Sequence, residues 1–428
     1  MKMKSKIGFS VITLIIMLVI TGVNVSAQDW PQWRGANREG VSKETGLNLN
    51  WADKKPALLW TFRQAGAGYA APTIVGTTLY GHGGAEGNDF AFALDTQTGK
   101  LKWKQNLGEL SVIERGDGPR GSVTVDGDKL YLIRGSGIIH CLAAADGKIL
   151  WQKDFKKDFN GALMSNWGFS ESPLVDGNLV ICSPGGAEGT VVALNKNSGS
   201  VVWRTKELTD NASHSSAIIA EVDGVRQYIL LAAKSVAGVA AKDGKLLWKI
   251  PIEGPRVVAV IPTPIYLNNM VYVTNGYGVG CFLVKLTRSG EIFNAEKVYS
   301  NSIITNQHGG VVQINGYLYG FSDQPSNSWV CQNMKTGEVA WSQRGQDVGV
   351  GKGSILGIND RLLLFDMLNG TLAVVAASPD GWKEFGKITI PERTKVTTQD
   401  NQLWTHPVVA NGKLFVRDHD LLFCFDLK

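Results

Sequence analysis

One short pattern recurs seven times along the chain: a small residue, then a Gly six positions later, then in most copies a Trp four positions further on. The clearest copy places these residues at Ala93, Gly99 and Trp103. Successive copies are 48, 52, 45, 46, 47 and 44 residues apart, measured between Gly99, Gly147, Gly199, Gly244, Gly290, Gly337 and Gly381. A period of about 40–50 residues built from short strands is typical of β-propeller blades. The repeat therefore predicts an all-β fold with a single domain.

The Gly and the Trp of the repeat have separate structural roles. Gly takes the positive φ that a tight hairpin turn requires. The Trp lies on the outermost strand of its unit, where a large apolar ring fills the space between adjacent blades. In the two weakest copies Asn294 and Phe385 stand at the Trp position. We interpret these Trp residues as packing residues and not as ligand-stacking residues.

The two ends of the chain carry complementary fragments of one further unit. Residues 57–60 end in Trp60, an outer-strand Trp with no inner strands before it, whereas residues 421–427 close a set of inner strands with no Trp after them. Pairing of the two fragments removes the exposed edges that an open sheet would leave. The sequence thus predicts eight four-stranded blades over residues 57–428, with the ring closed by pairing of the N- and C-terminal strands.

The first 27 residues match a secretory signal peptide. Lys2, Lys4 and Lys6 precede an apolar run at residues 11–20, and small residues at 25–27 offer a cleavage site. The run is shorter than the roughly 20 residues that a membrane span needs. The absence of a Cys near the cleavage point argues against a lipid anchor. We expect a monomeric protein that is periplasmic or secreted, with no membrane span.

The mature chain begins with an irregular arm and carries little net charge. Residues 28–56 include Trp30, Trp33 and Trp51 but no copy of the repeat, so we expect this arm to pack against the ring. The formal charge of +5 falls to about +2 once the three lysines of the leader are removed. A nearly neutral chain gives no indication of a nucleic-acid partner.

The five Cys residues fit the repeat better than they fit a set of disulfides. Cys141, Cys331 and Cys424 occupy the small-residue position that Ala93 takes in the clearest copy, so they belong to equivalent strands of different blades. Residues in such places are too far apart to be bridged. The other two, Cys182 and Cys281, also stand in apolar strand patterns. We predict five free, buried thiols.

The clearest copy, residues 93–103, has the form A-x-D-x-x-T-G-x-x-x-W and resembles the tryptophan-docking motif of PQQ-like repeats. These repeats build the propellers of the quinoprotein alcohol dehydrogenase-like superfamily. The segment at residues 29–35, Asp-Trp-Pro-Gln-Trp-Arg-Gly, also looks like the N-terminal segment of such proteins. The resemblance covers nearly all of the mature chain. It implies the fold and two kinds of function, since the superfamily contains dehydrogenases that bind pyrroloquinoline quinone with calcium and scaffold proteins that bind no quinone.

Departures from the dehydrogenase pattern favour the second kind of function. The sequence has no adjacent Cys pair to form the vicinal disulfide that covers the quinone in those enzymes. Most units are near minimal length, which leaves little chain for the loops that roof the active site. No motif matches the calcium-binding Glu and Asn or the catalytic Asp. We therefore expect a ligand- or partner-binding scaffold without redox chemistry, and keep as the alternative an alcohol or sugar dehydrogenase using pyrroloquinoline quinone and calcium.

Candidate binding residues stand immediately before the innermost strand of each unit. Because these positions are equivalent in all blades, their side chains surround the mouth of the central channel, where propellers commonly bind ligands. Trp167 and Trp404 lie near the same face and offer stacking platforms for a ring. The residues before the innermost strands are Tyr69, Arg120, Glu171, His214, Arg256, His308, Lys352 and His406.

Three histidines of this set, His214, His308 and His406, are the candidates for acid–base chemistry. They make a carbohydrate-active enzyme with a His-rich mouth a third reading. A solvated channel lined by polar scaffold residues explains the same pattern without any site. The sequence holds no H-x-x-x-H or C-x-x-C motif, so it predicts no metal site. The expected partner at this face is a small molecule, a carbohydrate or a protein.

Overall fold

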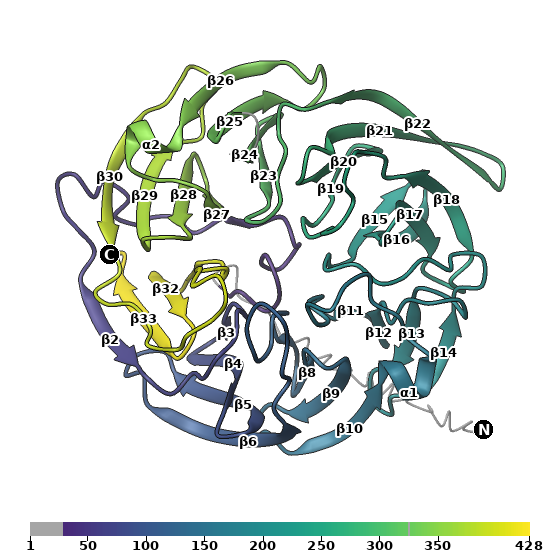
Figure 1. Ribbon diagram of the computed structural model, residues 1–428, viewed down its shortest axis with the longest axis horizontal. Coiled ribbons are helices and arrows are strands. Elements are labelled where there is room, and N and C mark those ends of the chain that lie inside the picture. The colour runs from purple at the N-terminus through teal and green to yellow at the C-terminus, as the bar shows by residue number, and fades with distance from the viewer. Residues whose placement is uncertain (1–28, 324–325) are drawn as a thin grey trace, which may run out of the picture.

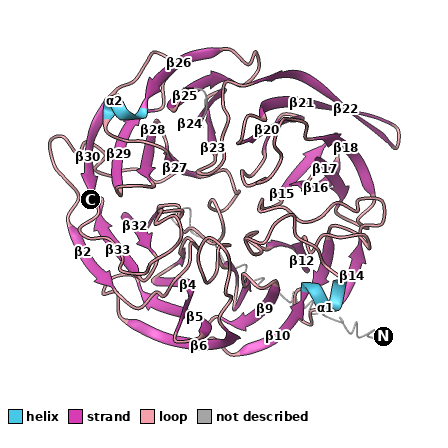
Figure 2. Cartoon of the chain, viewed as in Figure 1, coloured by secondary structure: helices cyan, strands magenta, loops and turns pink. Residues whose placement is uncertain are grey.

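The computed structural model describes residues 29–323 and 326–428, so the predicted signal peptide lies outside the described residues. Eight sheets stand around a central axis as the blades of a propeller (Figure 1). Two short helices, α1 (Phe155–Phe159) and α2 (Gly345–Val348), follow outer strands (Figure 2). Within the described parts of the chain, no helix has the length and apolar character needed to cross a membrane. The prediction of an all-β, eight-bladed propeller is confirmed.

The first four blades follow the chain from the central axis to the rim, and each alternates short strands with tight turns. Their strands are β3 (Thr73–Val75), β4 (Thr78–Ala85), β5 (Asn88–Asp95) and β6 (Leu101–Glu109); β7 (Thr124–Asp126), β8 (Lys129–Ile133), β9 (Ile138–Ala143) and β10 (Ile149–Asp154); β11 (Leu174–Asp176), β12 (Leu179–Cys182), β13 (Val192–Asn195) and β14 (Val201–Arg204); and β15 (Ile218–Val222), β16 (Val225–Leu231), β17 (Ser235–Ala240) and β18 (Leu246–Pro251).

The next three blades have the same order, and the eighth takes its outermost strand from the N-terminal side of the ring. Their strands are β19 (Ile265–Leu267), β20 (Met270–Asn275), β21 (Gly280–Ser289) and β22 (Ile292–Asn301); β23 (Val311–Ile314), β24 (Tyr317–Ser322), β25 (Ser328–Asn333) and β26 (Val339–Arg344); β27 (Gly353–Ile358), β28 (Arg361–Asp366), β29 (Thr371–Ala376) and β30 (Glu384–Thr389); and β31 (Val408–Ala410), β32 (Lys413–Asp418), β33 (Leu421–Asp426) and β2 (Leu58–Phe62).

The ring closes by antiparallel pairing of the two ends of the propeller. Strand β2 pairs with β33, with Trp60 opposite Cys424 and Phe62 opposite Leu422. This pairing gives the last blade its fourth strand, as the sequence predicts. Because β33 thereby gains its partner, the eighth blade presents the same edges as its neighbours.

Four outer-strand Trp residues pack on the Gly of the following blade. An atom of the Trp60 ring lies 2.7 Å from the place that a Cβ on Gly99 would take, and Trp60 Nε1 donates a hydrogen bond to Thr96 O at 3.1 Å. The same relation joins Trp103 to Gly147, Trp151 to Gly199 and Trp203 to Gly244. At these four positions the Gly is needed both for its turn and for the Trp of the preceding blade. At Gly290 and Gly381 no atom lies within 4 Å of an added Cβ, so there the Gly serves the turn alone.

The fifth blade corrects one detail of the repeat. Its outer hairpin, β21–β22, is longer than the others. The side chain that takes the place of the Trp is therefore Tyr299, which stands opposite Leu283 of β21, and not Asn294. Tyr299 packs against Gly337 and its hydroxyl donates to Met334 O at 2.9 Å. Counting four residues from Gly290 finds the wrong side chain because it assumes a hairpin of standard length. The five Cys residues are all free and buried, as predicted.

The N-terminal arm crosses the centre of the ring, where the purple segment of Figure 1 passes between the innermost strands. Residues 30–44 contact the inner strand, or the residue beside it, in every blade. The contacts in blade order are Trp30 with Ile74, Pro31 with Val125, Arg38 with Pro173 and with Ala217, Trp33 with Thr263, Arg34 with Val311, Val41 with Gly357, and Glu44 with Asn411.

Two features hold the arm in place. Strand β1 (Val41–Ser42) adds in parallel to β27 of the seventh blade. The buried guanidinium of Arg38 donates to the carbonyl oxygens of Ser172, Pro173 and Ala217. The arm thus divides the central channel into two separate cavities, one at each face of the ring.

Candidate functional site

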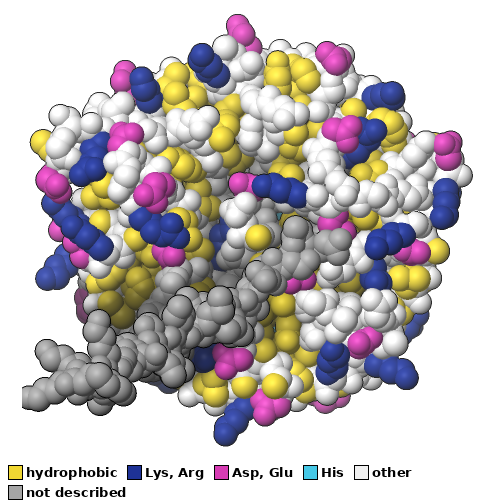
Figure 3. All heavy atoms as spheres, turned by 180° about the vertical axis from the view of Figure 1, so that it is seen from behind, with side chains coloured by type: hydrophobic (Ala, Val, Ile, Leu, Met, Phe, Trp, Pro, Cys, Tyr) yellow, Lys and Arg dark blue, Asp and Glu magenta, His cyan; other side chains and the backbone are white. Residues whose placement is uncertain are grey.

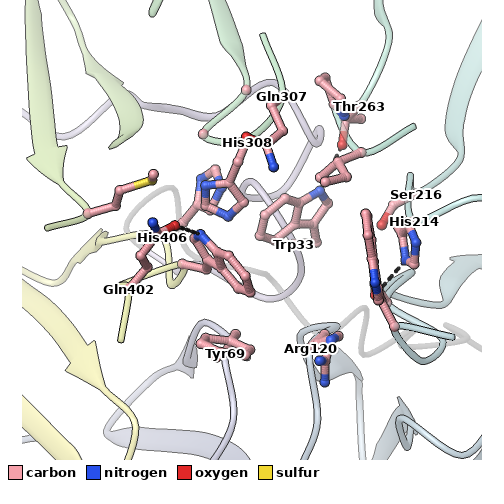
Figure 4. Close-up of a pocket in the computed structure, with 18 of the residues that line it drawn as sticks. Trp33, Tyr69, Arg120, His214, Ser216, Thr263, Gln307, His308, Gln402 and His406 are labelled. Carbon is pink, nitrogen blue, oxygen red and sulfur yellow. Dashed lines mark hydrogen bonds between the residues drawn. The ribbon is translucent and has the colours of Figure 1, made fainter. Parts of the chain in front are cut away.

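One pocket lies at the face where the inner strands begin, and the arm forms its floor (Figure 4). Its volume is about 350 Å³, within the range of about 300–1,000 Å³ for small-molecule sites. Eight of the ten predicted binding residues line it: Tyr69, Arg120, Trp167, His214, His308, Lys352, Trp404 and His406. The structure therefore brings together residues that are spread over more than 300 positions of the sequence.

The other two predicted residues do not line the pocket. Glu171 is buried beside β12, where its Oε1 accepts a hydrogen bond from Ser183 N. Burial raises the pKa of this carboxyl to about 7. Arg256 is exposed, with its guanidinium 5.4 Å from the ring centroid of Tyr277. The position before an inner strand thus turns either into the channel, as in most blades, or away from it.

The floor of the pocket comes from Trp33 and Arg34 of the arm. Trp33 Nε1 donates to Thr263 Oγ1 at 2.9 Å, and its ring meets His406 edge-on with centroids 4.6 Å apart. Arg34 is 5% exposed and lies between two glycines, since a Cβ on Gly40 or Gly310 would stand 2.6 Å from its guanidinium. From the sequence both residues are expected in the arm and not among the candidate binding residues.

Aromatic rings form much of the wall. Tyr69 and Trp404 lie with ring centroids 4.9 Å apart, and His308 is 6.1 Å from Trp404. Across the pocket the ring of Trp167 stacks on His214 at 5.8 Å. These rings offer flat surfaces to a planar or sugar-like ligand.

The three histidines are held in the neutral form. Burial is the main cause, and it lowers the pKa of His214 to about 4 and that of His308 to about 3. The pKa of His406 is also far below its usual value, because of burial and the nearby His308 and Arg34. Both ring nitrogens of His214 are engaged by the hydroxyls of Ser165 and Ser170 at 2.9 and 3.0 Å. Such imidazoles donate and accept hydrogen bonds but are weak bases.

Charged side chains reach the pocket from several blades. Arg115 Nη1 pairs with Asp400 at 3.1 Å, and Lys352 Nζ pairs with Asp323 at 3.0 Å. Arg120 lies with its guanidinium 5.4 Å from the centroid of the Tyr69 ring. Among the described residues that line the pocket, Asp400 is the one acidic side chain. The lining is therefore cationic.

Several lining residues are not predicted from the sequence, because they stand on connections outside the repeat. Arg115 lies in the loop before β7, and Asp400 and Gln402 lie in the long segment before β31. Tyr277 and Gln307 come from the turn after β20 and the loop before β23. Loop lengths differ between blades, so no fixed spacing marks these positions.

The residues present do not fit the calcium–quinone arrangement that the family resemblance implies. In the part of the chain that the structure describes, no group of three His, Cys, Asp or Glu side chains is close enough together to hold a metal ion. The Asp400 carboxylate is already engaged by Arg115. The five thiols are buried on strands, and none lines the pocket. The pocket therefore lacks the carboxylate cluster and the disulfide cover of that arrangement.

Comparison with known proteins finds a matching family model, curated relatives over part of the chain and solved structures of similar fold. The family model described as "Outer membrane protein assembly factor BamB" matches residues 89–343. Tetrathionate hydrolase of Acidithiobacillus ferrooxidans is 28% identical over 51% of this chain and 44% of its own. BamB of Yersinia pestis is 22% identical over 47% of this chain and 50% of its own. Quinohemoprotein alcohol dehydrogenase of Comamonas testosteroni superposes with a TM-score of 0.59 at 13% identity, covering 95% of this chain and 81% of the enzyme.

These similarities bear on family and fold. The matches span about half the length of the curated relatives. At 13% identity the likeness to the dehydrogenase concerns the fold alone. The family match, by contrast, covers more than half of the chain and includes most of the repeat. The chain therefore belongs to the propeller family described as outer membrane protein assembly factor BamB, PQQ_2.

Proposed function

We propose that this protein is an exported propeller that binds a small ligand at the mouth of its channel and carries out no redox chemistry of its own. The observation that carries the proposal is the recessed pocket of about 350 Å³, closed below by the arm. Its aromatic walls and convergent polar groups are typical of small-molecule sites. Export rests on the predicted signal peptide.

The chemistry of the lining favours binding over catalysis. The donor set does not suit a calcium-bound quinone, which argues against the dehydrogenase reading. Most glycoside hydrolases use a pair of carboxyl groups, whereas Asp400 is the one acidic side chain among the described lining residues. The buried, neutral histidines supply hydrogen bonds and little basicity. These features also argue against the carbohydrate-active enzyme.

A protein partner is the second candidate, and family membership favours it. Apolar side chains on the outermost strands are exposed, among them Leu59 of β2 and Val202 of β14. The face opposite the pocket displays positive and negative side chains interspersed with apolar ones (Figure 3). A scaffold of this kind would bind its partner by these surfaces and leave the pocket free.

Titration of the purified mature protein separates the candidates. Pyrroloquinoline quinone is added with and without calcium, while absorbance and dye-linked oxidation of alcohols and sugars are followed. We expect neither saturable quinone binding with turnover nor dye reduction. A parallel screen of sugars and small organic acids, followed by Trp fluorescence, is expected to find a saturable ligand because Trp33, Trp167 and Trp404 line the pocket.

Variants locate the binding. Trp404→Ala is expected to weaken the binding of any ligand found in this screen. Trp382→Ala, on the outer side of the seventh blade, is the matched control and is expected to leave binding unchanged. Quinone-dependent turnover would overturn the non-redox proposal. Failure of every small molecule to bind, with capture of a protein partner instead, would favour the scaffold.

A further inference from the structure

Four cationic side chains line the pocket, and two of them form ion pairs with carboxylates. Arg115 pairs with Asp400, and Lys352 pairs with Asp323. The remaining two, Arg34 and Arg120, make no ion pair with a carboxylate among the described residues. The pocket therefore holds two guanidinium groups whose charge is not balanced locally.

The hydrogen bonds of these two groups are also incomplete. Arg34 Nη2 donates to Glu39 O and Val311 O, but its buried Nε meets no partner among the described residues. Arg120 donates to Gly116 O at 2.9 Å and to Gly118 O at 3.2 Å. Since a guanidinium has five N–H donors, each group retains donors for a ligand.

Two buried arginines outside the pocket show that the fold does not impose this condition. Arg417 uses all five donors on carbonyl oxygens of the first and last blades. Arg38 contacts three carbonyl oxygens and the side-chain oxygen of Gln32. These two buried guanidinium groups use all or nearly all of their donors, whereas Arg34 and Arg120 are left with spare donors.

Burial makes the imbalance costly. It lowers the pKa of Arg34 and that of Arg120 to about 10. Glu39 only partly opposes this shift at Arg34, and Tyr69 and Asp117 only partly oppose it at Arg120. A charge removed from water without a counter-charge is strongly disfavoured. At neutral pH both groups stay charged. An anion that enters the pocket meets Arg34, which is only 5% exposed and has lost most of its water, and Arg120, which is partly exposed to the pocket. His308 adds a buried Nδ1 that has no partner among the described residues and that donates or accepts a hydrogen bond according to its tautomer.

We propose that the ligand of this pocket is a small organic anion, whose carboxylate binds Arg120 while its ring stacks on the aromatic wall formed by Tyr69 and Trp404. This rests on the proposed function and names the class of ligand. A carboxylate matches the planar fork of a guanidinium. Tyr69 contacts both Arg120 and Trp404, so charge and stacking are offered side by side. An acidic sugar and an aromatic acid share this chemistry.

The test uses matched pairs of acids and neutral analogues on the mature protein. Calorimetric titrations compare glucuronate with glucose, and benzoate with benzyl alcohol. We expect an acid to bind at least about tenfold more tightly than its neutral analogue, the size expected when a charge-assisted hydrogen bond is lost. The pair that shows this preference tells whether the ring is a sugar or an aromatic ring.

Variants then test whether Arg120 binds the carboxylate of the ligand. Arg120→Gln is expected to remove the preference for the acid, and Arg120→Lys to restore part of it. The control, Arg288→Gln, replaces an arginine that pairs with Glu291 near the tip of the β21–β22 hairpin. Circular dichroism and the melting temperature confirm that each variant is folded.

The outcomes separate the two proposals. Equal binding of the acid and its neutral analogue, or an unchanged preference in Arg120→Gln, overturns the anion inference and leaves the ligand-binding function standing. Failure of all four compounds to bind overturns the anion inference alone, because the ligand-binding function is overturned only when every compound of the wider screen fails.

Discussion

At the scale of single residues, burial keeps every histidine of this protein in its neutral form. The pKa is lowered from 6.5 in all six, mainly by desolvation: His82, His140, His214, His308, His406 and His419. His140 on β9 is the extreme case, because it is fully buried and neither ring nitrogen has a partner among the described residues. Near pH 6 the unfolded chain therefore binds protons that the folded chain does not bind.

This sets the pH dependence of stability. A depressed folded-state pKa gives stability that is complete above about pH 6.5 and is lost as pH falls toward the folded values, about 3 for His140. Each such histidine contributes up to about 1.4 kcal/mol per pH unit in that window. We expect the urea midpoint of unfolding to fall steeply between pH 7 and pH 5. A midpoint independent of pH would contradict the burial of these groups.

His140→Leu isolates one contribution. Leu is of similar volume and has no polar atoms to desolvate, so we expect the free energy of unfolding to rise by about 1–3 kcal/mol at pH 7. The gain is expected to grow as the pH is lowered, because the variant no longer takes up this proton on unfolding. Unfolding curves at pH 7 and pH 5.5 check both effects. A loss of stability at both pH values would show that the imidazole is satisfied in solution.

At the scale of elements, the unit that repeats is the contact between a Trp and the Gly of the following blade. That contact is visible in the sequence because it recurs with the same local geometry, and it makes the eight blades and their closure predictable. In the fifth blade Tyr299 makes the contact in place of a Trp, because the longer β21–β22 hairpin changes the count, and at Gly290 and Gly381 the contact is absent. Residues such as Arg115 and Asp400 were not predictable, since they stand on loops whose lengths differ and meet only in three dimensions.

The Trp–Gly contact predicts unequal effects of two Gly→Ala changes. Gly99 and Gly127 both have positive φ, 68° and 59°, but only at Gly99 does an added Cβ meet a ring, that of Trp60 at 2.7 Å. Gly127→Ala is expected to cost about 1–2 kcal/mol, the strain of a left-handed backbone. Gly99→Ala adds a clash worth about 1–3 kcal/mol. Urea unfolding compares the two, and equal losses would mean that the Trp ring moves aside without cost.

At the scale of the whole molecule, the arm connects blades that the repeat joins only to their neighbours. Neighbouring blades contact each other, but residues 30–44 contact all eight inner strands or their flanks. The path of the arm was not predictable, because it depends on how one irregular segment fits a channel built by the entire ring. The same segment supplies Trp33 and Arg34 to the pocket floor, so ring closure and ligand binding share one element.

A chain that begins at residue 45 tests this dual role. It keeps β2 and hence the closing pairing with β33, so we expect a folded propeller with a lower melting temperature. Ligand binding is expected to weaken at least about a hundredfold, since the floor and the Arg34 guanidinium are both lost.

A synthetic peptide of residues 29–44 is expected to restore binding, because its contacts with the ring are non-covalent hydrogen bonds and packing. A peptide with Arg38 and Trp33 replaced by Ala is the matched control, as these side chains anchor the arm to the third, fourth and fifth blades. Undiminished binding by the truncated chain would show that the inner strands alone form the site.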